Sequence, residues 1–465
     1  MKKHISFKIT LSASILIASI LFTGCTKDPD GAGPVPKISF DVSNAEALAG
    51  IADTQNRSAR AADPNALLQK IFDDGTVDSA MDIEGNSFGN NLSHIDYVIL
   101  PPENTNSKEI YLLLKKYSQA RVKVDEDVKD WYLSPLLCIH EDNSYDDVLL
   151  NSPYDVQTFN IIDSKNNIQF LKDGSLVYLI RGEGYDHFLN KWDPVTKQTT
   201  QLCKVTLSVE DGSLFVRSFS INKDEDYIYM YLDRVDANSY GYQYLKIIKI
   251  SDSSFDKEIG NGFPGVTGWC YNPYDDSLYY SKYSDETEPE QGLFKTDKTG
   301  STSEHLASEM FSRLIPESAQ KVWGVNSYDG GKFTIQNILS EKSETGFVEK
   351  FSYTAPEHYL FIIECDYIFA NDNLYLNHRF YCDGTGGHKD AIIVIPLSGS
   401  DSDIKNLLAF NENIMLHSWT VNEDSLFISG SDYETKETVN CKIDLKTGAQ
   451  VTIQSDSTFS SIAAF

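Results

Sequence analysis

The chain has 465 residues, with 68 Asp and Glu against 40 Lys and Arg, a formal net charge of −28 and an apolar content of 41%. This apolar content, together with 26 Tyr and 24 Phe, can build a buried core and excludes a disordered or fibrous chain. The acidity argues against nucleic-acid binding, because phosphate backbones select basic surfaces, and against electrostatic adhesion to anionic lipid.

The first predicted element is a signal peptide at residues 1–24. A basic start that includes Lys2, Lys3 and Lys8 precedes an apolar stretch from Ile9 to Phe22. This layout is typical of a secretory signal, and the stretch is short for a membrane-spanning helix, which needs about 20 apolar residues. The sequence therefore predicts export across a membrane.

The apolar stretch ends in Leu21-Phe22-Thr23-Gly24-Cys25, which resembles the lipobox of bacterial lipoproteins. The resemblance implies cleavage before Cys25, acylation of that residue and anchoring in the bacterial cell envelope. Several acyl chains on one residue give stable anchoring. Because Thr26 rather than Asp follows the cysteine, the resemblance implies the outer membrane, with the protein either periplasmic or surface-exposed. The alternative is an ordinary secretory signal with an incidental cysteine.

Residues 25–65 are predicted to be the lipidated Cys25 followed by a flexible tether. Residues 28–36 are rich in Pro, Gly and Asp, which favour turns and linkers and offer nothing to pack. The Ala-rich residues 45–62 are interpreted either as a short helix or as more linker.

Two sequence units alternate from residue 66 to residue 465. The first is a polar turn followed by a short aromatic and apolar strand, and it recurs with a mean spacing of about 53 residues. Its strands are marked by Ile110, Leu176, Ile228, Leu278, Phe333, Leu374 and Leu426. The second unit is an apolar strand followed by a turn containing Asp, Thr or Gly, most clearly at residues 294–300 and 442–448. Each unit predicts a β-hairpin.

Two hairpins in each period predict an all-β fold, a β-propeller of seven or eight four-stranded blades. Apolar runs such as residues 176–180 and 227–232 suit sheets that are covered on both faces. We expect strands from both chain ends to close the ring, with residues 459–465 supplying an inner strand to the blade that begins near Leu67. The chain thus resembles β-propeller lipoproteins at the level of architecture. Tandem β-sandwiches are the alternative.

The sequence contains no nucleophile elbow, zinc-binding helix, phosphate-binding loop or EF-hand motif. Its histidines show no ligand spacing, and we expect no metal or cofactor. Six cysteines besides Cys25 permit up to three disulfides, whose pairing the sequence leaves open.

Four aromatic residues precede the second strand of their repeats by 7 to 10 residues: Phe219, Trp269, Trp323 and Trp419. This spacing predicts that they lie on first strands near the propeller axis, where they either wedge blades together or bind a ligand. The sequence favours a membrane-anchored extracytoplasmic binding or scaffold lipoprotein without evident catalysis, with a protein or glycan as its ligand. The alternative is an extracytoplasmic carbohydrate-active enzyme, a lyase or hydrolase with an axial active site.

Overall fold

The structure of the protein is a computed structural model. It describes residues 33–34, 37–51, 67–84, 92–102, 108–116, 120–124, 127–131, 135–149, 165–181, 186–207, 213–235, 241–260, 265–283, 290–328, 332–343, 346–354, 359–362, 366–382, 388–407, 414–432 and 434–465. The predicted signal peptide and Cys25 lie outside these residues. Within them, no helix has the length and apolar character needed to cross a membrane.

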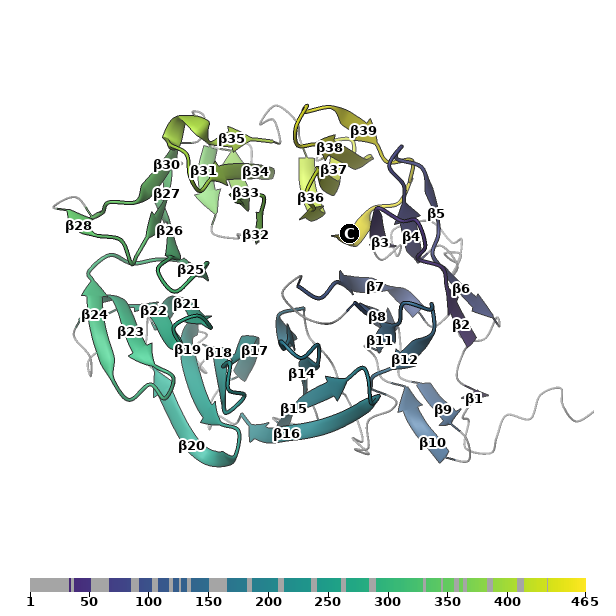
Figure 1. The fold of residues 1–465 in the computed structure, drawn as a ribbon, viewed down its shortest axis with the longest axis horizontal. Coiled ribbons are helices and arrows are strands. Elements are labelled where there is room, and N and C mark those ends of the chain that lie inside the picture. Colours follow the sequence, from purple (N-terminus) through teal and green to yellow (C-terminus); the bar gives the residue numbers. More distant parts are fainter. Residues whose placement is uncertain are drawn as a thin grey trace, which may run out of the picture.

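Eight antiparallel sheets of the described residues are arranged as a ring (Figure 1). In each sheet the first strand lies toward the centre of the ring and the last lies at its outer edge (Figure 1). The fold is an eight-bladed β-propeller, which confirms the prediction of an all-β propeller and decides the number of blades.

The first four blades are formed as follows. Blade 1 contains β40 (Phe459–Ala464), β3 (Ala47–Ile51), β4 (Leu68–Ile71) and β5 (Val77–Ser79). Blade 2 contains β7 (Leu92–Ile99), β8 (Ile110–Lys116), β11 (Leu136–Ile139) and β12 (Tyr145–Asp147). Blade 3 contains β13 (Ile168–Phe170), β14 (Leu176–Arg181), β15 (Asp186–Asp193) and β16 (Gln198–Thr206). Blade 4 contains β17 (Ser213–Ile221), β18 (Tyr227–Val235), β19 (Gly241–Lys249) and β20 (Asp252–Ile259).

The remaining blades follow in chain order. Blade 5 contains β21 (Val266–Asn272), β22 (Ser277–Lys282), β23 (Gly292–Asp297) and β24 (Ser303–Ala307). Blade 6 contains β25 (Arg313–Pro316), β26 (Val322–Tyr328), β27 (Lys332–Asn337) and β30 (Lys350–Thr354). In blade 7, β31 (Tyr359–Ile362) and β32 (Tyr367–Ala370) pair with the two halves of β33 (Asn373–Cys382), which β34 (His388–Pro396) and β35 (Lys405–Asn406) follow. Blade 8 contains β36 (Ile414–Val421), β37 (Ser425–Asp432), β38 (Thr438–Asp444) and β39 (Gln450–Thr452).

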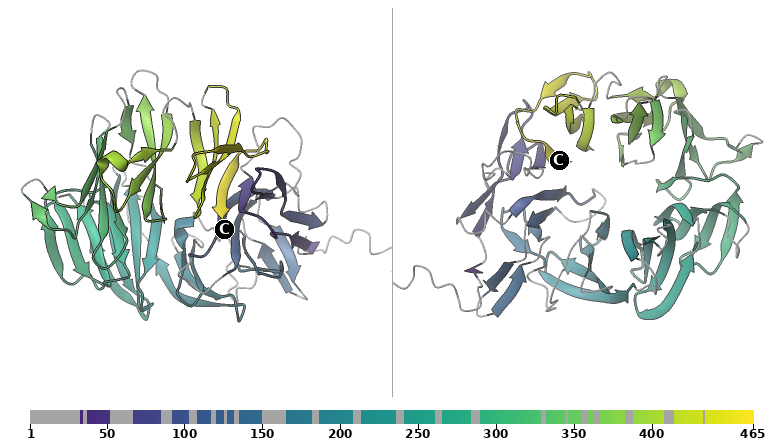
Figure 2. Two further views of the ribbon diagram at one scale, coloured as in Figure 1. Left: turned by 45° about the horizontal axis from the view of Figure 1, so that its top comes forward. Right: turned by 180° about the vertical axis from the view of Figure 1, so that it is seen from behind.

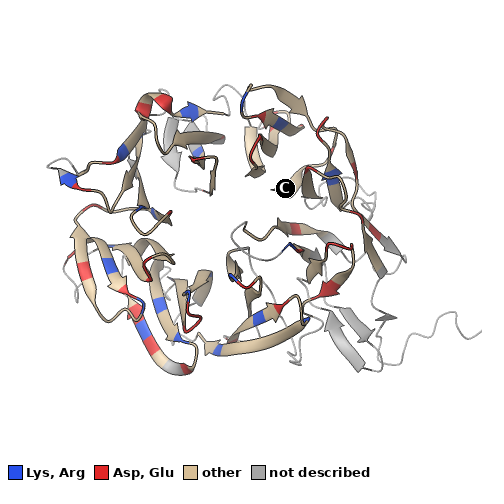
Figure 3. Ribbon diagram, in the orientation of Figure 1, with Lys and Arg blue, Asp and Glu red and all other residues tan. Residues whose placement is uncertain are grey.

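Short elements lie outside these blades. They are β1 (Gly33–Pro34), β2 (Lys37–Phe40), β6 (Met81–Glu84), β9 (Ala120–Val124), β10 (Asp127–Trp131), the hairpin of β28 (Lys342–Ser343) and β29 (Gly346–Phe347), and the 3₁₀ turns η2 (Lys165–Asn167) and η3 (Asp401–Asp403). Acidic and basic residues are mixed around the ring rather than separated onto two sides (Figure 3).

Both ends of the described chain close the ring in blade 1. The C-terminal strand β40 is its innermost strand and pairs antiparallel with β3, so that Ala47 lies opposite Ala464 (Figures 1 and 2). The predicted closure by the terminal strand is therefore confirmed. Pairing the two ends removes the exposed sheet edges that an open array would present.

The predicted boundary between tether and propeller at residue 66 lies too late in the chain. Strand β3 falls inside the predicted tether, yet all five of its residues are buried. Its small side chains have a packing reason, because a Cβ atom added to Gly50 would lie 2.7 Å from Cγ2 of Ile95 on the neighbouring blade. The Ala-rich sequence suggested a helix or a linker. The conformational preferences of the residues themselves do not reflect the close packing of β3 against the neighbouring blade.

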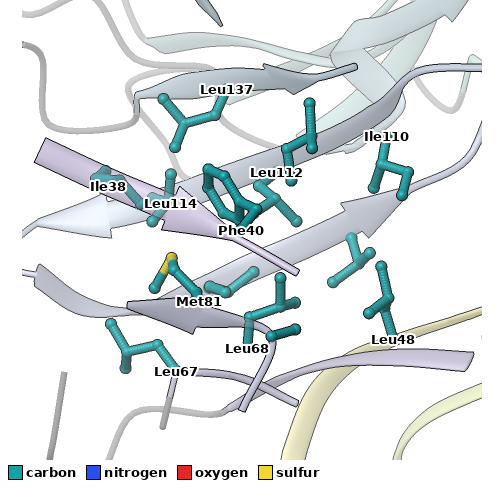
Figure 4. Packing of buried hydrophobic residues seen from close by; sticks show 14 of the residues in the cluster. Ile38, Phe40, Leu48, Leu67, Leu68, Met81, Ile110, Leu112, Leu114 and Leu137 are labelled. Carbon is teal, nitrogen blue, oxygen red and sulfur yellow. The ribbon is translucent and has the colours of Figure 1, made fainter. Parts of the chain in front are cut away.

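Strand β2 also lies inside the predicted tether and is bound to the propeller. It pairs antiparallel with β6, and its Ile38 and Phe40 are buried among residues of blades 1 and 2, including Leu68 and Leu112 (Figure 4). The aromatic ring of Phe40 packs edge-on against Tyr145 at 5.5 Å between centroids. Strand β2 is therefore part of the propeller domain and not of a free tether.

The second sequence unit corresponds to third strands and the turns that follow them. In Lys191-Trp192-Asp193, Lys295-Thr296-Asp297 and Lys442-Ile443-Asp444, the aspartate accepts a hydrogen bond from the backbone N–H two residues later, at 2.8, 3.0 and 3.0 Å. This Asx geometry closes a tight turn without backbone strain at the aspartate. It explains why the pattern recurs at the same place in different blades.

The antiparallel order gives the ring two distinct faces. Turns from first to second strand and from third to fourth strand lie on one face, which we call the hairpin face. Connections from second to third strand, and from one blade to the next, lie on the opposite face, which we call the crossover face. This follows because each strand runs from one face to the other.

Candidate functional site

Three of the four predicted aromatics lie on first strands, as expected. Phe219 lies on β17, Trp269 on β21 and Trp419 on β36. Each packs into a different apolar cluster between blades, and Trp269 contacts Tyr231 with 6.1 Å between ring centroids. The structure therefore places them as separate wedges between blades and does not bring them together; their role in ligand binding stays a prediction.

Trp323 does not lie on a first strand, so its predicted position is wrong. It lies on β26, the second strand of blade 6, and is fully buried against Phe351. Its indole N–H donates a hydrogen bond to Glu317. The repeat was assigned one strand late here, because Phe333 on the third strand β27 matches the same turn-and-strand pattern. Trp323 has no surface to offer a ligand.

Arg313, on the first strand of blade 6, lies close to two residues of blade 7: Tyr367 on its first strand and His378 on its second strand β33. The guanidinium of Arg313 on β25 lies over the ring of Tyr367 on β32, 5.6 Å from its centroid. Burial, and then the charge of Arg313, lower the pKa of His378 to about 3. His378 is therefore neutral at physiological pH and does not serve as a proton donor there.

A groove opens on the hairpin face between blades 7 and 8. It has a volume of about 440 Å³, within the range of small-molecule pockets. Its lining combines an apolar floor with amide and charged groups from four turns. The lining residues are Asn371, Asn373, Tyr375, Val394, Pro396, Asp403, Lys405, Leu407, Glu423, Asp424, Leu445 and Lys446.

One wall of the groove is the turn between β32 and β33. Its residues Asn371 and Asp372 both have positive φ, 53° and 56°, the conformation of a tight hairpin turn that Asn and Asp tolerate well. The Asn371 amide donates a hydrogen bond across the groove to the backbone oxygen of Glu423, at 2.7 Å. This bond fixes the turn of blade 7 against the turn of blade 8.

A second contact between the same two blades is buried. Asp390 on β34 is 3% exposed and accepts hydrogen bonds from Arg379 at 2.9 Å and from the backbone N–H of Leu416 at 2.6 Å. A buried carboxylate is stable when it is paired and hydrogen-bonded in this way. The two blades that form the groove are therefore held in a fixed relation.

The charged groups at the rim differ in whether they already form hydrogen bonds or ion pairs within the protein. Hydrogen bonds from the backbone and side chain of Ser400 lower the pKa of Asp403. A hydrogen bond to Asp424 raises the pKa of Lys446, which forms an ion pair with that carboxylate. Within the described part of the chain, Lys405 and Glu423 are exposed and form no ion pair. Lys405 and Glu423 are therefore rim charges with which a ligand can pair.

The described residues include no group of three or more His, Cys, Asp or Glu side chains that could hold a metal ion. Of the six cysteines that could form disulfides, Cys138, Cys203 and Cys270 are free thiols, and these three and Cys441 are buried. Cys365 lies outside the described residues.

No protein-family model and no curated protein sequence matches the chain. Among solved structures it is similar to a prolyl endopeptidase, with 9% identity, a TM-score of 0.47 and coverage of 80% of this chain and 50% of that one. It is also similar to a puromycin hydrolase (12% identity, TM-score 0.45, coverage 76% and 53%) and to the acylaminoacyl peptidase of Pyrococcus horikoshii (9% identity, TM-score 0.36, coverage 77% and 53%). The chain spans about half the length of these proteins.

No motif in the sequence indicated the groove. Its residues come from turns and strand ends spread between residues 371 and 446, and they share no motif. The single local signal is Asn371-Asp372 between two apolar strands, which predicts a tight hairpin turn. Only the packing of adjacent blades brings these turns to one place.

Proposed function

We propose that this protein is a lipid-anchored binding protein of the bacterial cell envelope that holds a peptide segment in the groove between blades 7 and 8. The observation that carries the proposal is the groove itself, with an apolar floor, polar amides and both signs of charge at its rim. Ligand pockets in proteins typically combine an apolar lining with a few placed polar groups. The lipobox ending in Cys25 supports the anchor.

The lining favours a peptide over a sugar. Sugars are commonly held by stacking on an exposed aromatic ring. The aromatic side chain among the described lining residues is Tyr375, and it is only 3% exposed, so its ring face is not offered to a ligand. A peptide supplies apolar side chains for Leu407 and Leu445 and charges that complement Lys405 and Glu423.

The binding experiment uses the detergent-solubilised lipoprotein and an array of short peptides that combine apolar, acidic and basic side chains. We expect a subset of the peptides to bind. Lys405→Glu should weaken the binding of peptides that contain an acidic residue by about tenfold, because one attractive charge contact is lost and replaced by a repulsive one. The matched control is Lys436→Glu, the same change on the β37–β38 turn at the crossover face of blade 8. This control variant is expected to bind as the parent does.

Two outcomes would contradict the binding proposal. Equal losses in the two variants would show that the change acts through net charge and not through the groove. Binding or cleavage of glycans, in a parallel screen with the same protein, would favour the carbohydrate-active alternative. The anchor is tested separately by metabolic labelling with a fatty acid, which we expect Cys25→Ala to abolish.

A further inference from the structure

The chain enters the propeller at its crossover face. Strand β1 pairs with β9, which lies in the connection from the second to the third strand of blade 2. Strand β2 pairs with β6, which lies in the connection from blade 1 to blade 2. Both connections belong to the crossover face. Figure 1 shows these elements beside one another at the outer edge of blades 1 and 2.

After this entry the chain crosses to the other face without leaving the domain. Asp41, directly after β2, pairs with Lys70 on the third strand of blade 1 at 2.7 Å. The backbone N–H of Val42 donates to the side chain of Asn143, in a hairpin-face turn of blade 2. Since Ile38 and Phe40 are buried in the core between these blades, β2 is a fixed attachment point.

The sequence between Cys25 and β1, the first strand that pairs with the domain, is short. Seven residues, 26–32, precede β1, and even fully extended they span at most about 25 Å. A domain of this size has a radius of gyration of about 22 Å, and hence a diameter of roughly 55 Å. A lipid on Cys25 is therefore held within less than half a domain diameter of the crossover face at blades 1 and 2.

We propose that the propeller faces the lipid bilayer with the crossover face of blades 1 and 2, and that the hairpin face with its groove points away into the aqueous compartment. The proposal rests on the proposed lipid anchor at Cys25. The groove lies on the opposite face because its lining comes from first-to-second and third-to-fourth strand turns of blades 7 and 8. The anchor thus sets the side from which a ligand reaches the groove.

The experiment measures how close each face lies to the lipid headgroups. Single cysteines are introduced at exposed positions, Ser39→Cys on β2, and Val195→Cys and Glu423→Cys on hairpin-face turns, and are labelled with a fluorescent donor. The lipidated proteins are reconstituted into phosphatidylcholine vesicles that carry a headgroup acceptor. Labelling of the unsubstituted lipoprotein gives the background from native thiols.

We expect energy transfer at Ser39→Cys to be at least about twice that at Val195→Cys and Glu423→Cys, because transfer falls steeply with distance. Equal transfer at the three sites, or the reverse order, would overturn the orientation. Inserting 20 Gly and Ser residues after Thr26 is expected to remove the difference, since the linker then reaches around the domain. A difference that survives this insertion would also overturn the role of the short linker.

Flotation of the vesicles separates this proposal from the anchor on which it rests. If the protein floats with the vesicles only when Cys25 is present, the anchor stands and the transfer values decide the orientation. If the parent protein and Cys25→Ala behave alike, the anchor itself is refuted, and the orientation is refuted with it.

Discussion

Lys442 and Glu46, separated by 396 residues in the sequence, form an ion pair of 2.7 Å where the ring closes. The ammonium group of Lys442 also lies 2.6 Å from a carboxylate oxygen of Asp73. Lys442 belongs to β38 of blade 8, and both carboxylates belong to blade 1. The side chain of Lys442 is only 8% exposed. This lysine therefore ties the last complete blade to the blade that the two chain ends build together.

We expect Lys442→Ala to destabilise the protein by about 2 kcal/mol, between the values for exposed pairs and for fully buried ones. The reason is that a partly buried Glu46 loses its cation. The measurement is urea unfolding followed by intrinsic fluorescence. The control is Lys446→Ala on the same blade, whose pair with Asp424 is exposed and is expected to contribute less than about 1 kcal/mol.

The contribution of Lys442 has a defined dependence on pH. Burial opposes its charge, but hydrogen bonds to Asp73 and Glu46 outweigh this effect and raise the pKa of Lys442 above 10.5. A raised lysine pKa gives stability that is fully present below the ordinary pKa and is lost as pH rises through the folded-state value. The difference between the parent and Lys442→Ala should thus be constant from pH 6 to pH 9. A difference that shrinks within this range would contradict the assignment.

Acid is expected to destabilise the protein through aspartates in its turns and pairs. A hydrogen bond from Lys70, followed by those from Ser43, lowers the pKa of Asp41 from 3.8 to about 2. Backbone hydrogen bonds similarly lower the pKa of Asp444 and Asp432. A lowered carboxylate pKa gives stability that is present above the unfolded-state value and is lost as pH falls through the folded-state value.

Protonation of these aspartates should therefore have little effect on the melting temperature above pH 5. It should lower the melting temperature as the pH falls from about 4 to 2. Asp41→Asn should melt below the parent at pH 7, and the two should converge as the pH approaches 2. A gap in melting temperature that stays constant down to pH 2 would show that Asp41 contributes through packing rather than through its charge.

The four buried cysteines, Cys138, Cys203, Cys270 and Cys441, are expected to be unreactive in the folded protein. Burial raises the pKa of Cys138 to about 12, that of Cys203 to about 11, and that of Cys270 as well. The thiolate is the reactive form, so both its scarcity and the lack of access suppress alkylation. Iodoacetamide at pH 8, followed by peptide mass spectrometry, should modify these residues only after denaturation. Rapid modification of Cys270 in the native protein would contradict its buried position.

The sequence predicted the strands that end in turns closed by short-range hydrogen bonds. The Lys-X-Asp units at Asp193, Asp297 and Asp444 form third strands and Asx-closed turns, because short-range hydrogen bonds decide these structures. The same kind of pattern assigned the strands of blade 6 wrongly. Its first strand β25 is short and precedes Trp323, and the sequence around Phe333 on the third strand resembles a second strand. Local patterns recognise a hairpin but do not count strands within a blade.

The groove and the strand β3 could not be predicted for a different reason. Asn371, Lys405, Glu423 and Lys446 meet only because blades 7 and 8 pack side by side, and no spacing in the sequence records this contact. The small residues of β3 are likewise explained by their close packing against the neighbouring blade and not by a preference of these residues for strands.

The close approach of Gly50 to Ile95 gives a direct test of how blade 1 packs on blade 2. A methyl group at position 50 would lie 2.7 Å from Cγ2 of Ile95, closer than two carbon atoms can approach, so the blades must shift. We expect Gly50→Ala to destabilise the protein by about 1–3 kcal/mol, the usual result of overpacking a buried site, measured by urea unfolding. Gly241→Ala is the matched control, since the nearest atom to its added methyl is 3.7 Å away. Removing the clashing Cγ2 in the double variant Gly50→Ala with Ile95→Ala should make the two losses less than additive, whereas additive losses would place the strain elsewhere.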